Sequence, residues 1–323
     1  MQNVNEIESK NYTTMWQQSR PDIAWGTLAL FLGVVLGYLL VIGSALNGSL
    51  PYVAATLICS CLAFASFTVF HDAGHGSIFS MGSPLKPIEG VIGWVASVPL
   101  LIAPYRLFQK IHDRHHAFTN DPDRDPDHYT FGEKWYQVAF NCLFIPFQYH
   151  ILSVTRLRHT KVIRDTYAST IVYLVVVFSS LIALLSSGLG LEVICFAIIP
   201  VVIAIFFLTM FFDYIPHHPH KSRSRYHDSR IYPSRLLNIL LLGQNYHLIH
   251  HMYPRLPWYK YQEVYGRILP YLEAQGAPIE DISGAIRPGF MKSPKTRQLQ
   301  SGGEAVDMVL KVENIERLTS DAV

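Results

Sequence analysis

The sequence predicts an all-α integral membrane protein with two transmembrane helical hairpins (about four spans), interfacial or re-entrant helices and a histidine-rich cytoplasmic cap. Half of the 323 residues are hydrophobic and only 15% are charged, which is unusual for soluble domains of this length. Four apolar runs are long enough to be membrane-spanning helices. The histidines gather in clusters at the ends of these runs, which places a polar site at the membrane boundary.

The composition also restricts the partners and the domain organisation. A net charge of +2 is too small to indicate nucleic acid binding. The four cysteines lie in apolar stretches without a CxxC pair, so we expect them to be small core residues. Residues 1–24 form a polar leader that lacks the features of a signal peptide. We therefore expect one membrane domain at 25–283 and a polar tail at 284–323, to which we assign no chemistry.

The first hairpin follows the leader directly. Residues 25–46 contain no charge, and 22 helical residues suffice to cross a hydrocarbon layer of about 30 Å. Residues 48–51 predict a tight turn, and the apolar run 52–70 returns across the membrane to end at His71.

Three of the next segments are expected to lie at the membrane interface, and two to cross it. The run 88–104 is interrupted by glycine and proline, and we expect a re-entrant hairpin or short half-helices, because one span would separate histidine clusters that share a site. The aromatic, amphipathic run 136–150 predicts an interfacial helix. Runs 169–187 and 191–213 form the second hairpin, and the short apolar run 235–242 belongs at the interface.

Counting the crossings places all histidine clusters on one side of the membrane. That side carries many basic residues, whereas the turns near 47–50 and 186–190 carry no lysine or arginine. By the positive-inside rule the histidine face is cytoplasmic.

Three histidine clusters indicate a metal site. The stretch 245–251 places His247, His250 and His251 at i, i+3 and i+4, on one face of a helix. The same spacing recurs earlier in the chain, a shorter cluster sets two histidines at i and i+4, and one further histidine follows the last span; these residues are His112, His115 and His116, then His71 and His75, then His217. Imidazole is a common metal ligand, and packing alone gives no reason to repeat the spacing.

The number of histidines favours two metal ions. A tetrahedral zinc needs about four ligands, so nine histidines exceed the needs of one ion. A zinc hydrolase of the HExxH type remains an alternative, but aspartate follows His71 and His112 where that motif has glutamate. Nitrogen-rich sites with open positions suit iron and oxygen activation.

Polar residues beside the clusters are candidates for orienting the ligands. Asp72, Asp213 and Asn245 are predicted to accept a hydrogen bond from a ligating imidazole or to hold a metal-bound water. The aspartate-rich run 119–127 is expected to be a rigid loop that caps the second cluster and pairs with arginines. The isolated histidines are expected to be ordinary interface residues (His128, His150, His159, His227), whereas two neighbours of His217 could replace it as the ninth ligand (His218, His220).

The combination of HxxxH, HxxHH, a lone histidine and HxxHH around two hairpins resembles the membrane fatty acid desaturase and hydroxylase superfamily. The resemblance covers roughly residues 25–275. Within the superfamily the sequence looks most similar to CrtR-type β-carotene hydroxylases, on the segments 71–75, 119–129, 211–217, 230–233 and 243–259. It departs from the pattern at Gly74 and Gly76, which could widen the entry to the metals.

The resemblance implies an oxygen-dependent di-iron monooxygenase that hydroxylates C3 of the β-ionone ring, converting β-carotene through β-cryptoxanthin to zeaxanthin. The nine cluster histidines would ligate two Fe²⁺ ions, with O₂ as co-substrate. The implied partners are a hydrophobic substrate dissolved in the membrane lipids and a cytoplasmic donor such as ferredoxin, since no nucleotide motif is visible in the chain.

Two other functions are compatible with the same residues. The same metal site could serve an acyl-lipid desaturase or a carotenoid ketolase, because these reactions differ by small shifts in substrate geometry. A metal transporter or sensor would instead need ligands spread along a path across the membrane.

Overall fold

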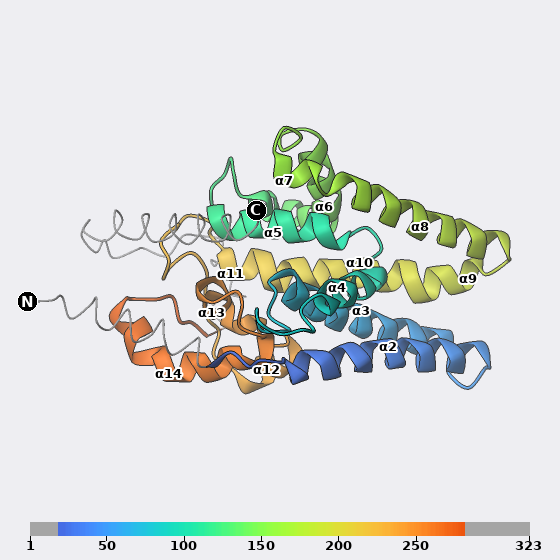
Figure 1. Cartoon of the computed structure of the whole chain (residues 1–323), viewed down its shortest axis with the longest axis horizontal. Helices are drawn as coiled ribbons and strands as arrows, with labels where there is room; N and C mark the ends of the chain where they lie inside the picture. Colours follow the sequence, from blue (N-terminus) through green and yellow to red (C-terminus); the bar gives the residue numbers. More distant parts are fainter. Residues whose placement is uncertain (1–18, 282–323) are drawn as a thin grey trace, which may run out of the picture.

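The computed structural model describes residues 19–281, and its regular secondary structure consists of helices joined by loops (Figure 1). Within these residues the only sheet-like pairings are two isolated bridges, Ile23 with Phe79 and Ile231 with Ile279. The predicted all-α class is confirmed. The predicted tail at 284–323 and most of the leader lie outside the described residues.

Four helices in the described part are long and apolar enough to cross a membrane, as predicted. The first hairpin is α2 (Trp25–Leu46) and α3 (Tyr52–Gly74), and the second begins with α8 (Tyr167–Ser186). The second hairpin returns as one rod of consecutive helical segments: α9 (Gly190–Val193), η3 (Ile194–Ile198), α10 (Ile199–Leu208), η4 (Thr209–Tyr214) and α11 (Ile215–His217). Figure 1 shows the two connecting turns at the same end of the molecule.

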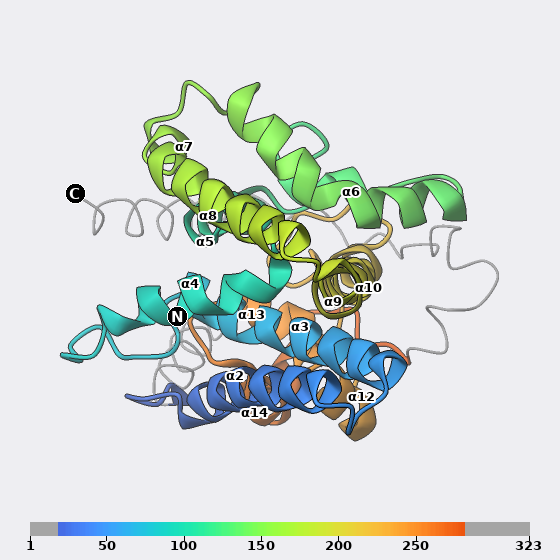
Figure 2. The same ribbon diagram turned by 90° about the vertical axis from the view of Figure 1, so that its right-hand side faces the viewer.

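Helix α3 is the central element of the bundle. Seen end-on, it lies between α2 and α10, with α8 farther out (Figure 2). The Tyr52 hydroxyl donates to the Glu192 carboxylate over 2.7 Å, and this ties the two hairpins together at the end with the turns. The outward faces of α2 and α8 expose leucine, isoleucine and valine, as expected for surfaces that face hydrocarbon.

The segment predicted to be re-entrant is a bent helix pair. Helices α4 (Ile88–Ser97) and α5 (Tyr105–Phe118) meet at 95°, with η1 (Val98–Leu100) between them. Pro99 and Pro104 account for the break, because proline interrupts helical hydrogen bonding. Helix α5 is then fastened to the end of α3, since Tyr105 donates to the Ala73 carbonyl oxygen (2.9 Å) and Gln109 to that of Gly74 (2.8 Å).

The remaining helices flank the spans. Helix α6 (Trp135–Val154) exposes aromatic rings along one side, and the short α12 (Arg235–Leu240), capped by Ser234, exposes Leu236 and Ile239. Both features suit the predicted interfacial position. The other segments are α7 (Lys161–Arg164), η2 (Pro126–Thr130), η5 (Gln244–Tyr246), α13 (His247–Met252), η6 (Trp258–Lys260) and α14 (Tyr261–Ala274).

Candidate metal centre

The nine histidines singled out in the sequence converge at one end of the bundle. They come from the last turn of α3, one face of α5, the end of α11 and one face of α13. Their spacing of three or four residues keeps the members of each helix on the same side. Their ring nitrogens form two groups of four, with His116 between the groups.

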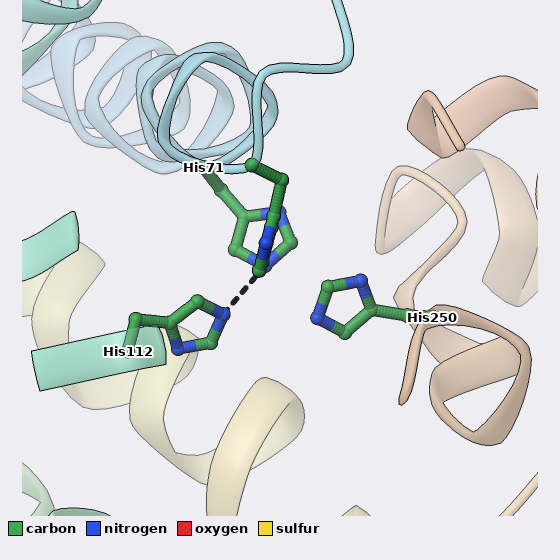
Figure 3. Close-up of side chains that lie close together, drawn as sticks. His71, His112 and His250 are labelled. Atoms are coloured by element: carbon green, nitrogen blue, oxygen red, sulfur yellow. Dashed lines mark hydrogen bonds between the residues drawn. The ribbon is translucent and has the colours of Figure 1, made fainter. Parts of the chain in front are cut away.

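The first group consists of His71, His75, His112 and His250, whose ligating nitrogens all lie within 4.8 Å of one another. The Nε2 atoms of His71 and His112 are 3.0 Å apart. Figure 3 shows the rings of His71, His112 and His250 pointing toward one another from α3, α5 and α13. Contact between α3 and α5 at this end means that the bent pair returns the chain to the side it left.

The second group consists of His115, His217, His247 and His251, again within 4.8 Å of one another. The Nε2 atom of His247 lies 3.0 Å from that of His217 and 3.1 Å from that of His251. The Nε2 atoms of His115 and His251 are 3.3 Å apart. The structure therefore brings His217 into this set, and not its neighbours His218 and His220.

His116 lies between the two groups. Its Nε2 atom is 2.9 Å from that of His250 and 3.1 Å from that of His112, and it also forms a set with His250 and His251. It could complete the first group or bind between the two.

The histidines on α13 are neutral imidazoles, and hydrogen bonds at Nδ1 leave the Nε2 atoms of His247 and of His217 on α11 free to bind a metal. Burial, followed by the neighbouring imidazoles, holds the pKa of His247, His250 and His251 well below the usual value. The Nδ1 atom of His217 donates to the Asp228 carbonyl oxygen (2.9 Å) and that of His247 to Gln244 Oε1 (3.2 Å). These bonds place the ring proton on Nδ1 and leave Nε2 unprotonated.

His115 has carboxylate partners that the sequence analysis missed. Its Nδ1 atom lies 2.8 Å from Asp125 Oδ1 and 3.3 Å from Asp127 Oδ2. Burial raises the pKa of Asp127. For Asp125 burial acts in the same direction, but His115 and the backbone N–H of Asp127 together lower the pKa below its usual value. The aspartate-rich loop that follows the cluster was the available signal, but only Asp121 makes the expected contacts, with Arg124 and Arg223.

The three polar residues predicted to orient ligands have other surroundings. Asp72 accepts a hydrogen bond from Thr27 (2.6 Å), and Asn245 donates to the Tyr232 carbonyl oxygen (2.9 Å). Asp213 is buried, and its carboxylate oxygens have no hydrogen-bond partner in the described part of the chain. An indirect role through a metal-bound water stays a prediction for these residues.

The isolated histidines lie outside both groups. His150 bonds to the Ile102 carbonyl oxygen (2.8 Å), His159 and His227 are exposed, and His128 contacts the ring of His220.

The turn that leads into the α13 histidine cluster requires a glycine. Gly243 has φ = +83°, and a Cβ atom there would lie 2.5 Å from the Trp258 carbonyl oxygen. Only glycine fits this position without strain. The close approach packs the start of η5, which leads into α13, against η6, which leads into α14.

An apolar cavity opens beside both groups. His71, His112 and His247 form part of its wall, and most of the rest is apolar, with Ile205 and Leu208 from the spanning rod and Ile145 from α6 among its lining. A long hydrocarbon could therefore reach the ring nitrogens from inside the membrane.

The donor sets fit two transition-metal ions. Each group offers four imidazole nitrogens and no carboxylate, which suits iron, zinc or copper better than calcium or magnesium. The buried Nε2 atom of His75 has no hydrogen-bond partner in residues 19–281, as expected of a nitrogen that binds a metal. Two ions held by these groups would account for the close approach of the ring nitrogens.

Comparisons with known proteins point to one family. A family model described as fatty acid desaturase matches residues 47–283. The chain is 37% identical over 87 residues to the omega-3 fatty acid desaturase fat-1 of Caenorhabditis elegans, covering 27% of this chain and 20% of the relative. It is 32% identical over 116 residues to an sn-1 acyl-lipid omega-3 desaturase (ferredoxin) of Synechocystis, covering 36% of this chain and 31% of the relative. The chain thus spans less than a third of the length of either relative.

Proposed function

Since the chain belongs to the fatty acid desaturase family, we propose that it is an oxygen-dependent di-iron oxidoreductase acting on an unactivated C–H bond of a hydrocarbon dissolved in the membrane. The observation that carries the proposal is the pair of four-histidine groups at the wall of an apolar cavity. A transporter would need ligands along a crossing path, and here they gather at one end of the bundle.

The proposed ligands of one iron are His71, His75, His112 and His250, and those of the other are His115, His217, His247 and His251, with His116 completing the first set or bridging. Two iron ions held in this way would supply the activation of O₂ that an unactivated C–H bond requires. The chain's own residues orient these imidazoles. His217 is held by the Asp228 carbonyl oxygen and His247 by Gln244, whereas Asp125 and Asp127 hold the ring of His115.

The cavity would bind the substrate and exclude water. Its lining includes Phe67, Phe108 and Phe212, together with residues of the spanning helices. A hydrocarbon chain could therefore pass from the bilayer into the cavity without exposing its apolar surface to water. Binding energy from the remote part of the chain would fix the position of the reacting carbon relative to the histidines.

The leading candidate substrate is the acyl chain of a membrane lipid, and the leading reaction is desaturation. Support comes from the two relatives, which are both named as omega-3 desaturases. Of the functions compatible with the sequence, the comparisons therefore favour the acyl-lipid desaturase over the carotenoid hydroxylase.

The second candidate is hydroxylation of the β-ionone ring, or its ketolation. The supporting observation is the sequence resemblance at 211–217, 230–233 and 243–259, which includes His217 and the whole α13 cluster. This candidate stays open because neither desaturase relative is matched over more than a third of its length. It requires that the β-ionone ring fit into the cavity beside Phe212.

The donor is proposed to be a ferredoxin at the cytoplasmic side. One relative carries the word ferredoxin in its name, and the basic residues of the chain lie toward the histidine end.

Expression in a host that makes β-carotene tests the substrate. The chain should introduce new double bonds into the host's lipids and leave the carotenoids unchanged, as measured by mass spectrometry of both fractions. Zeaxanthin or echinenone with unaltered lipids would establish the second candidate instead. A His250→Ala chain expressed to the same level is the control and should change neither fraction.

A further inference from the structure

A hydrogen-bonded chain links the cavity wall to the second histidine group. The Tyr149 hydroxyl donates to Asp127 Oδ1 over 2.5 Å. The other oxygen of this carboxylate, Oδ2, lies 3.3 Å from His115 Nδ1. Tyr149 and Asp127 both line the cavity, whereas His115 Nε2 points into the second group. Three side chains thus join the place for the substrate to a proposed metal ligand.

The two carboxylates at His115 are held in different ways. Asp125 is fixed by its own loop, because its side chain accepts backbone N–H bonds from Asn120 (2.7 Å) and Asp127 (2.9 Å). The Asp127 carboxylate is held instead by the phenol of Tyr149, a residue of α6 that is distant in sequence. Asp125 is therefore the constant partner of His115, and the contribution of Asp127 depends on where Tyr149 lies.

We propose that Tyr149 is a positioning residue, which acts through Asp127 to set the orientation and basicity of His115 at the second metal. The inference rests on the proposed function, because it concerns a ligand of the iron pair. A carboxylate bonded to the outer nitrogen of a ligating imidazole fixes the ring and strengthens it as a ligand. Without the phenol, the Asp127 carboxylate is free to turn away from His115. The change should then affect only the metal bound by the second histidine group.

The experiment uses the full chain loaded with ⁵⁷Fe in detergent and compares Mössbauer spectra of wild type, Tyr149→Phe, Asp127→Asn and the double variant. Each single variant should retain both irons while altering the quadrupole splitting of one, and should weaken the binding of that iron about 10-fold. The double variant should resemble the singles, because both substitutions break the same chain of contacts. Tyr173→Phe is the matched control, since Tyr173 also donates to an oxygen, the Ser97 carbonyl (2.7 Å), but lies outside the cavity lining.

An unchanged spectrum in Tyr149→Phe overturns the inference, as do equal changes at both irons or effects that add up in the double variant. These outcomes leave the di-iron proposal standing. A wild-type chain without iron overturns the proposed function and this inference with it.

Discussion

At the scale of single residues, several of the proposed ligands are oriented by an atom that contacts Nδ1, the ring nitrogen facing away from the metal site. His217 and His247 are oriented by a carbonyl oxygen and an amide oxygen, and His250 Nδ1 lies 3.1 Å from the Tyr261 hydroxyl. Such partners hold a histidine in place before any ion arrives. Removing one imidazole should therefore affect its own group most.

Replacing His250 by alanine should lower the iron content from about two to about one per chain and abolish oxidation, because His250 is the α13 member of the first group. Metal analysis of the purified chain and the product assay check this. The control is His159→Ala, which alters an exposed histidine and should match the wild type. A His250→Ala chain with full iron and activity would contradict the assignment.

At the scale of elements, the bend between α4 and α5 decides where the second cluster lies. The ring of Tyr105, the first residue of α5, packs onto α4 at Gly93, and its hydroxyl bonds to the end of α3. Tyr105 thereby holds the start of α5 against the middle of α4 and the end of α3 that carries His71 and His75.

Gly93→Ala should destabilise the chain by about 1–3 kcal/mol, because the new methyl group would lie 2.3 Å from Tyr105 Cε2 and has to displace that ring. The matched control is Gly90→Ala in the same helix, where a Cβ meets nothing within 4 Å and the better helix propensity should stabilise by up to about 1 kcal/mol. Thermal unfolding in detergent measures both. Equal midpoints for the two variants would show that the packing of Tyr105 does not hold the bend.

At the scale of the whole molecule, the two hairpins place both tight turns at the end opposite the histidines. Ser187 lies exposed in one turn, and Asp123 is exposed in the loop after α5. In a bilayer these positions should face opposite compartments.

Labelling of single cysteines tests the proposed cytoplasmic side. In sealed right-side-out vesicles, a membrane-impermeant maleimide should label Ser187→Cys at once and Asp123→Cys only after permeabilisation. The unsubstituted chain is the control and should remain unlabelled, since Cys59 and Cys142 are buried and the other two cysteines, Cys61 and Cys195, lie on membrane-spanning helices. The reverse pattern would place the histidines outside.

Removing the metals should loosen the whole helical assembly, because each group joins three separate parts of the chain. Ions present at about 1,000 times their dissociation constant stabilise by about 4 kcal/mol. A chelator should therefore lower the unfolding midpoint, and Fe²⁺ should restore it. The shift should be smaller in His250→Ala, and equal midpoints with and without chelator would argue against resident ions.

The features that could be predicted from the sequence are those that depend on the spacing of residues along a helix or on the length of an apolar run. Apolar runs of helical length indicated the four spans, and the spacing within each histidine cluster indicated one helix face. The sequence did not predict the Asp125–Asp127–Tyr149 contacts, because these join a loop to a helix that local pattern does not relate. The α4–α5 bend was expected only in outline, since its angle depends on how Tyr105 packs against Gly93.

The cavity is bounded in part by Ile205 and Leu208 of a membrane-crossing rod, so the proposed substrate would arrive by lateral diffusion in the plane of the membrane. Turnover should then follow the mole fraction of the reactant among the lipids rather than its bulk molarity. Diluting the vesicles with buffer would leave the velocity per enzyme unchanged, whereas diluting them with inert lipid would lower it.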